Sequence, residues 1–136
     1  MQVRFVLETC LYVDDLPAAE EFYTRVLGLE VLTRQEERHV FFRCGGQMLL
    51  LFNPAHTDHG DDEIPHHGAR GSGHVAFGVE ADELPAWRAW FAAEGVPIES
   101  EVEWPNGALS VYFRDPADNC LELATPSLWG LKMPPE

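Results

Sequence analysis

The sequence predicts an α+β protein built from two consecutive βαβββ modules, because its first half recurs in altered form in its second half. A strand pattern followed by a helix with a proline in its first turn occurs at 8–27 and again at 74–94. A glycine, Gly28 or Gly95, then ends each helix, and short apolar runs typical of strands follow. Since 136 residues suit one compact domain, the two modules are expected to share a core or to complete one with a second chain.

In the first module, alternating apolar residues predict a strand over 3–13. Asp14 and Asp15 supply an N-cap for a helix over 17–27, and Gly28 is a natural residue to end it. Three further strands are expected to complete the module, at 29–36, 39–44 and 47–53.

The second module repeats this order, with a strand at 73–80, a helix at 83–94 and strands near 97–103, 109–114 and 119–124. The expected domain is a single one over 1–136, with module 1 at about 3–54, a linker at 55–72, module 2 at about 73–126 and a tail at 127–136. The linker contains four histidines and no apolar periodicity, which predicts a lid or a solvated loop. Apolar residues in the tail, Trp129 among them, predict that it docks.

The net charge of −14, from 23 acidic and 9 basic residues, argues against nucleic acid or an anionic membrane as the main partner. No apolar run approaches the length of a membrane span, and the N-terminus lacks the features of a signal peptide. Three cysteines without a CxxC pair are typical of reduced thiols. These features predict a cytoplasmic protein.

Three acid or imidazole side chains, Glu8, His74 and Glu122, occupy strand positions where an apolar residue would serve a core better. Glu8 and His74 are equivalent in the repeat, and the counterpart of Glu122 is Leu50. If one face of each half-sheet lines a common cavity, the three groups converge there and suit a divalent cation with open positions. Taken alone, each of these residues is more often a structural histidine or a surface acid. The prediction of a metal site therefore depends on all three occurring at matching positions of the repeat.

The pattern resembles the vicinal oxygen chelate superfamily, which includes glyoxalase I, fosfomycin resistance proteins, methylmalonyl-CoA epimerase, extradiol dioxygenases and bleomycin resistance proteins. The resemblance covers about 5–126, and it is carried by VDDL at 13–16, VLGL at 26–29, GHVAF at 73–77, YFRDPADN at 112–119 and LEL at 121–123. In this family, paired βαβββ modules form an open barrel-like sheet around a metal. Its ligands come from the first strand of each module and the last strand of one or both.

The resemblance implies metal ligands at His74 and Glu122, and an oxygen ligand at Glu8, where many members have histidine and some glyoxalases glutamine. Leu50 stands where glyoxalase I has a fourth, carboxylate ligand, so the pattern is closer to the three-ligand arrangement of fosfomycin resistance proteins and dioxygenases. Tyr112 matches a tyrosine near the substrate in fosfomycin resistance proteins. The basic residue that those proteins carry beyond the last glutamate has no counterpart here, so fosfomycin is not the expected substrate.

The first functional hypothesis is therefore an enzyme that uses Mn, Fe, Ni or Zn to hold a small oxygen-chelating substrate, with Glu8, His74 and Glu122 as ligands. Glu8 and Glu122 are the candidate catalytic carboxylates, and lyase, isomerase, addition and oxygenation chemistry all stay open. The side chains expected near the substrate are Tyr112, Trp104 and Arg70. A tryptophan in such a loop is more often simply packed, and an arginine such as Arg70 is more often simply exposed.

The alternative hypothesis is a non-enzymatic protein of the bleomycin resistance type, which sequesters a small molecule without a metal. A homodimer is expected under both hypotheses, with the cavity either within one chain or shared between two. Truncation of Glu122 separates the hypotheses, because only a metal site needs its carboxylate.

Overall fold

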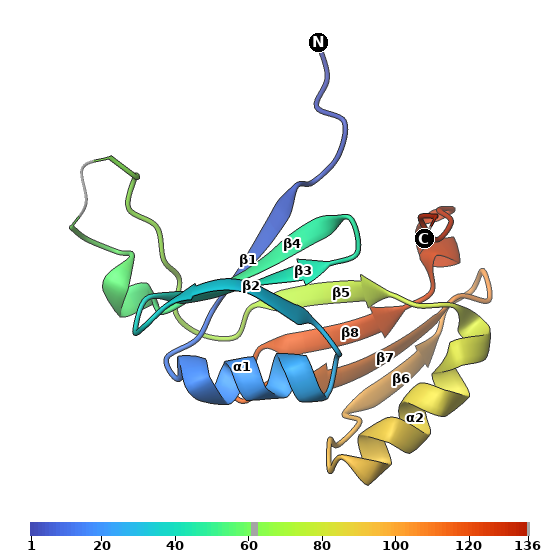
Figure 1. Ribbon diagram of the computed structural model, residues 1–136. Coiled ribbons are helices and arrows are strands. Elements are labelled where there is room, and N and C mark those ends of the chain that lie inside the picture. The colour runs from blue at the N-terminus through green and yellow to red at the C-terminus, as the bar shows by residue number, and fades with distance from the viewer. Residues whose placement is uncertain (61–62, 136) are drawn as a thin grey trace. The chain divides into compact units, whose positions relative to one another are not determined.

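In the computed structural model, which describes residues 1–60 and 63–135, the chain divides into two compact units, Met1–Gly73 and His74–Glu136. Each unit contains a four-stranded mixed sheet and follows the order βαβββ, as Figure 1 shows. This architecture confirms the predicted α+β class. No helix in the described ranges is long and apolar enough to cross a membrane.

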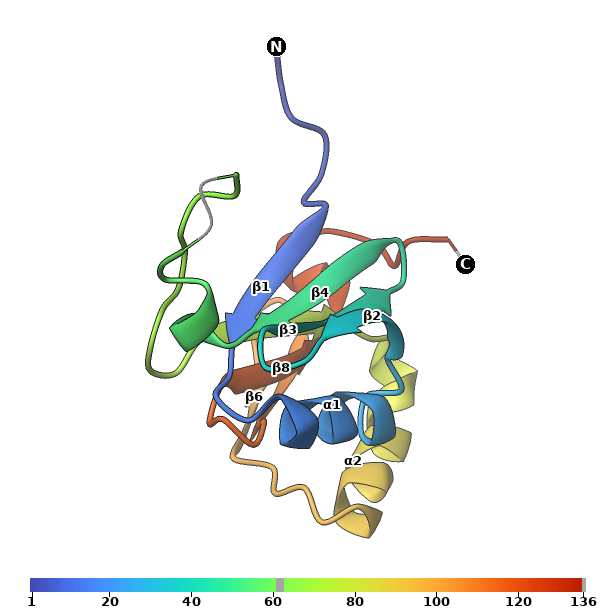
Figure 2. The same ribbon diagram turned by 60° about the vertical axis from the view of Figure 1, so that its left-hand side comes forward.

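The sheet of the first unit has the order β1-β4-β3-β2, in which β1 runs parallel to β4 and the other pairs are antiparallel. The strands are β1 Glu8–Tyr12, β2 Glu30–Gln35, β3 His39–Cys44 and β4 Gln47–Phe52. Helix α1, Leu16–Arg25, packs on β2 and β3 along one face of this sheet (Figure 2). The Asp15 side chain accepts the backbone N–H of Ala18 at 3.0 Å, which confirms the predicted N-cap.

The first strand is shorter than predicted, because the alternating residues before Glu8 lie outside the sheet. Val3 is 89% and Phe5 64% exposed, and the N-terminal arm extends away from the sheet of its unit (Figure 1). Strand β4 begins at Gln47 and pairs with β1 from Glu8 to Tyr12, with one further bond of 3.1 Å from the Met48 N–H to the backbone oxygen of Leu7. Alternation predicts a strand only where a neighbouring strand is present to pair with it. The tail docks only in part: Asn106 donates to the backbone oxygens of Ser127 and Leu128, whereas Trp129 is 78% exposed.

The sheet of the second unit has the order β5-β8-β7-β6, again with its first and last strands parallel. Its elements are β5 His74–Gly78, α2 Leu84–Ala93, β6 Ser100–Glu103, β7 Leu109–Arg114 and β8 Cys120–Ala124. Leu84, Phe91 and Phe113 are fully buried, and the rings of Phe91 and Phe113 lie 4.6 Å apart between centroids. These apolar contacts form the core beneath the strands that carry the candidate site.

The strand registers confirm that Glu8 and His74 are equivalent in the repeat. Glu8 is the first residue of β1 and pairs with Met48 on the parallel strand β4. His74 is the first residue of β5 and pairs with Cys120 on the parallel strand β8. The two side chains therefore occupy the same place in their own sheets.

The registers also confirm the match between Leu50 and Glu122. Leu50 lies two residues beyond the partner of Glu8 and pairs with Phe41 on β3. Glu122 lies two residues beyond the partner of His74 and pairs with Tyr112 on β7. Because residues two apart on a strand share a face, the polar group at Glu122 is a specific departure from an otherwise matching sheet.

Candidate functional site

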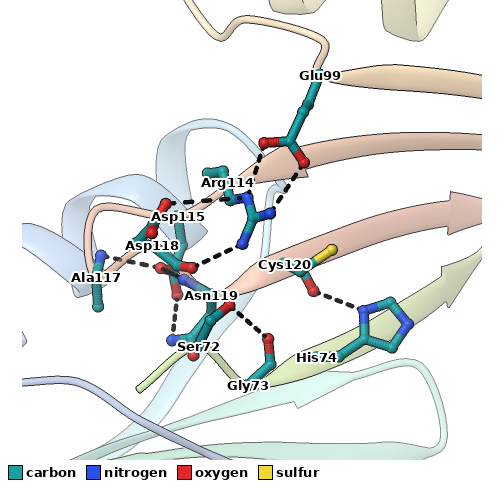
Figure 3. A network of polar contacts seen from close by, with 10 residues as sticks. All are labelled: Ser72, Gly73, His74, Glu99, Arg114, Asp115, Ala117, Asp118, Asn119 and Cys120. Atoms are coloured by element: carbon teal, nitrogen blue, oxygen red, sulfur yellow. Dashed lines mark hydrogen bonds and ion pairs between the residues drawn. The ribbon is translucent and has the colours of Figure 1, made fainter. Parts of the chain in front are cut away.

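His74 is fixed by its own sheet through one ring nitrogen. Its Nδ1 lies 2.8 Å from the backbone oxygen of Cys120, the residue opposite it on β8 (Figure 3). A carbonyl oxygen only accepts, so Nδ1 carries a proton and donates it. When the ring is neutral, this leaves a lone pair at Nε2, and the side chain is 51% exposed, within reach of a ligand.

Glu122 lies on β8 with only 5% of its surface exposed, and its two carboxylate oxygens have different partners. Oε1 is 3.3 Å from Nε2 of His74, and Oε2 accepts a hydrogen bond of 2.5 Å from the hydroxyl of Ser110. Nε2 of the neutral ring and Oε1 both offer electron pairs, so the pair can hold one proton or one cation between them. A buried carboxylate is costly unless it has such partners.

Ser110 connects Glu122 to Trp104. The indole Nε1 of Trp104 lies 2.9 Å from Oγ of Ser110, which is 1% exposed on β7. Sequence reasoning did not single out Ser110. The signal that it overlooked is the spacing of Ser110 and Tyr112, two residues apart on the strand next to Glu122, which places both on its face of the sheet.

Tyr112 pairs with Glu122 in the register of β7 and β8. Burial is the largest cause that raises the pKa of the Tyr112 phenol, and the charge of Glu122 raises it further. A hydrogen bond with Ser110 acts in the opposite direction. Because its pKa is raised, the phenol stays protonated at neutral pH and can donate a hydrogen bond.

The turn between β7 and β8 holds these strands in register (Figure 3). One carboxylate oxygen of Asp115 accepts the backbone N–H of Asn119 at 2.9 Å, and the other accepts its side-chain amide at 3.0 Å. Arg114 donates to Glu99 at 3.0 Å and to the backbone oxygen of Asp118 at 3.1 Å. This ordered turn leads directly into the strand that carries Glu122.

Glu8 lies in the first unit, at the exposed start of β1. Its charge raises the pKa of the Cys10 thiol, although burial is the larger cause of that shift. Across 1–60 and 63–135, no group of three or more His, Cys, Asp or Glu side chains is placed to hold a metal ion together. The role of Glu8 as a third ligand stays a prediction.

Arg70, predicted to contact the substrate, lies in the linker and forms an ion pair with Asp58. Its Nη2 is 2.8 Å from Oδ2 of Asp58, and Nδ1 of His59 is 2.7 Å from the other oxygen. The hydrogen bond with His59 is the largest cause that lowers the pKa of Asp58, followed by the bond with Arg70. The substrate roles of Arg70 and Trp104 stay predictions.

An aromatic cluster occupies the face of the first sheet that carries Leu50, and sequence reasoning missed it. The linker residue His67 joins it, because Nδ1 of His67 lies 2.7 Å from the hydroxyl of Tyr12 and its ring lies 4.7 Å from that of Phe52. This part of the linker is therefore packed rather than fully solvated. The members of the cluster are Tyr12, His39, Phe41, Phe52 and His67.

Comparisons with known proteins agree with this architecture. The family model of the Glyoxalase/Bleomycin resistance protein/Dioxygenase superfamily matches residues 5–123. A crystal structure of lactoylglutathione lyase from Agrobacterium tumefaciens is 45% identical in sequence, with a TM-score of 0.93, and the match covers 96% of this chain and 100% of that one. The comparison with curated proteins gave no match.

Two more distant structures show likeness of fold alone. A glyoxalase/bleomycin resistance protein/dioxygenase from Nocardioides is 24% identical, with a TM-score of 0.74 and coverage of 92% of this chain and 85% of that one. A genomically encoded fosfomycin resistance protein from Listeria monocytogenes is 22% identical, with a TM-score of 0.68 and coverage of 91% and 94%. From the family match across most of its length, the chain belongs to the Glyoxalase/Bleomycin resistance protein/Dioxygenase superfamily.

Proposed function

We propose that this protein is a divalent-metal-dependent enzyme of the glyoxalase type, with lyase chemistry on a small substrate that offers two neighbouring oxygens. The observation that carries the proposal is the pair formed by His74 and Glu122, whose Nε2 and Oε1 lie 3.3 Å apart. The 45% identity to a lactoylglutathione lyase over nearly the full length of both chains supports the reaction class.

The pair fits a divalent cation by its chemistry and its spacing. Bonds of about 2.0–2.2 Å from a cation such as zinc to nitrogen and oxygen place neighbouring ligand atoms roughly 2.9–3.4 Å apart. The measured 3.3 Å between Nε2 of His74 and Oε1 of Glu122 lies in that range. The bond from Nδ1 of His74 to a backbone carbonyl is also the outer contact that usually orients a metal-binding imidazole.

Glu8 is the proposed third ligand, because it occupies in β1 the place that His74 occupies in β5. When bound, the ion would act as a Lewis acid that stabilises negative charge developing on the substrate oxygens. Glu8 is also the better candidate for moving a substrate proton, since it is exposed whereas Glu122 is buried and hydrogen-bonded. Tyr112, which lies on the strand beside Glu122 and is protonated at neutral pH, is the proposed hydrogen-bond donor to a substrate oxygen.

Leu50 limits the comparison with a four-ligand glyoxalase I. It is 7% exposed and cannot bind a cation, so the first unit supplies no carboxylate at the place of Glu122. The proposed site therefore has three protein ligands and leaves more positions open for substrate and water. The compound to test first is lactoylglutathione, for which the similar lyase is named, with its cleavage as the readout.

A binding protein without catalytic activity is the second candidate, and the aromatic cluster favours it. The rings of His39 and Phe41 are stacked at 3.9 Å, and the ring of Phe52 meets that of Phe41 edge-on at 5.2 Å. Partly exposed rings such as those of His39 and Phe41 suit the flat apolar part of a small molecule. A binding protein of this kind does not need the polar pair formed by His74 and Glu122. For that reason the binding function is the second candidate.

We also propose that the protein forms a homodimer. Large apolar side chains are exposed at both ends of the chain, with Phe5 64%, Leu7 62% and Trp129 78% exposed. Exposed apolar groups of this size are typical of surfaces that a partner covers. Sedimentation velocity on the protein and on a Phe5→Ser, Leu7→Ser variant tests this proposal, because the variant is expected to shift toward the monomer.

The deciding experiment is elemental analysis of untagged protein purified without chelators. About one ion per chain is expected for the wild type, as for one site with three protein ligands. Glu8→Ala, His74→Ala and Glu122→Ala are expected to lose the ion, whereas the control His66→Ala, an exposed linker histidine, is expected to keep it. Wild-type protein that takes up no Mn, Fe, Ni or Zn would contradict the proposal and turn attention to ligand binding by the aromatic cluster.

A further inference from the structure

We infer that Ser110 is a positioning residue that, held by Trp104, fixes one oxygen of Glu122 and leaves the other as the only one directed at His74. The inference rests on the proposed function for the identity of the ligand, a divalent cation. The hydrogen-bond chain itself is a property of the protein without the ion.

The chain of donors runs in one direction. An indole N–H only donates, so the 2.9 Å contact from Nε1 of Trp104 engages a lone pair of the Ser110 hydroxyl. Glu122 as a carboxylate only accepts, so the 2.5 Å contact at its Oε2 engages the single hydroxyl proton of Ser110. Trp104 therefore orients the hydroxyl so that its proton points at Glu122.

Burial gives this contact its strength. Ser110 is 1% and Glu122 5% exposed, so bulk water cannot readily replace the donor at Oε2. Hydrogen bonds to an ionised group are about twice as strong as those between neutral groups. Without the hydroxyl, the buried Oε2 loses this donor, and the hydrogen bond between Tyr112 and Glu122 is left to orient the carboxylate toward His74.

The fixed oxygen decides how Glu122 can bind a cation. With Oε2 held by Ser110, only Oε1 is directed at His74, so a cation would be bound through a single oxygen of Glu122. The first unit lacks the whole arrangement, since His39 occupies the place of Ser110 and Leu50 the place of Glu122. The donor and the acceptor that it serves are both confined to the second unit.

The test is the affinity of Ser110 variants for Zn²⁺, measured by competition with a chromophoric chelator. Loss of such an outer-shell partner typically weakens metal binding about 10–100-fold, which is the expectation for Ser110→Ala. Ser110→Thr keeps the hydroxyl and is expected to restore the affinity to within about threefold of the wild type. Ser100→Ala, an exposed serine on β6, is the control and is expected to change nothing.

A double-mutant cycle separates positioning from general loosening of the structure. Trp104→Phe removes the indole donor and is expected to weaken Zn²⁺ binding in the wild type but not in Ser110→Ala, because the two act in series. Equal Zn²⁺ affinity of Ser110→Ala and the wild type, or additive effects of the two changes, would overturn the inference.

A second measurement needs no metal. In ¹⁵N-labelled protein without metal, the indole N–H resonance of Trp104 is expected to shift in Ser110→Ala, since its acceptor is lost. An unchanged resonance overturns the hydrogen-bond chain. If the wild type binds no cation but the resonance shifts, the proposed function fails while the positioning of Glu122 by Ser110 stands.

Discussion

Nε2 of His74 lies 3.3 Å from Oε1 of Glu122, although the two residues come from the first and last strands of their unit. Parallel pairing of β5 with β8 brings them together, with Cys120 opposite His74 and Glu122 next but one along the strand. Residues that share a face of two paired strands are neighbours, so the sheet itself holds this pair.

Replacing Glu122 by leucine copies the equivalent residue of the first unit, Leu50. The free energy of unfolding is expected to fall by about 1–3 kcal/mol, because the change removes one partner only and leaves the buried hydroxyl of Ser110 without its acceptor. Metal uptake is expected to vanish in the same variant. Urea unfolding and elemental analysis check the two outcomes. Unchanged stability of Glu122→Leu would contradict the account of the Ser110 hydrogen bond.

The turn before β8 is expected to depend on Asp115. Asp115→Ala removes acceptors of two hydrogen bonds with Asn119 and is expected to lower the free energy of unfolding by about 1–3 kcal/mol. Asp118 has a φ of 66°, a conformation that glycine adopts at little cost, so Asp118→Gly is the matched control and should keep its stability. Thermal and urea unfolding give the stability of both variants. Equal free energies of unfolding for Asp115→Ala and Asp118→Gly would contradict this account of the turn.

His39 is expected to make the protein less stable in mild acid. Burial is the largest cause that lowers the pKa of His39, and the charge of Arg38 lowers it further. The native protein therefore binds this proton less readily than the unfolded chain, so stability falls as the pH drops below about 6.5, the ordinary histidine value. His39→Phe should reduce this loss in melting temperature between about pH 6.5 and 5, whereas the exposed His66→Ala should not.

Cys10 reports on the charge of Glu8. Burial is the larger and Glu8 the smaller cause of the raised pKa of the Cys10 thiol, so little reactive thiolate is expected at neutral pH. Glu8→Gln lowers that pKa and should speed alkylation of Cys10 by iodoacetamide, followed by mass spectrometry. Cys44 is the internal control, because burial alone raises its pKa. Equal Cys10 rates in the two proteins would mean that Glu8 points away from the thiol.

The repeated sheet could be predicted from the sequence, because strands with one buried face impose a period of two and place Glu8 and His74 in matching positions. The same period marked Glu122 as a polar residue among apolar neighbours. The link from Trp104 through Ser110 could not be predicted, because it depends on side-chain rotamers and on the register of β7 against β8.

Two other features of the structure could not be predicted from the local sequence pattern. The strand begins at Glu8 because β4 starts at Gln47 and its backbone bonds to this segment reach back no further than the oxygen of Leu7, which is a property of a distant segment. The packing of His67 on Tyr12 and Phe52 comes from a linker without periodicity, where no repeating signal indicates which side chain turns inward.

Pairing of the first and last strands within each unit has a consequence for the chain as it is made. A nascent chain that has emerged only to β7 already contains His74, but the strand that pairs with β5 has not yet left the ribosome. Contacts between segments so far apart in sequence form late, after the loop between them closes. Translation products that stop before Cys120 therefore carry an unpaired β5, a target for chaperones and proteases, and no pair of His74 with Glu122.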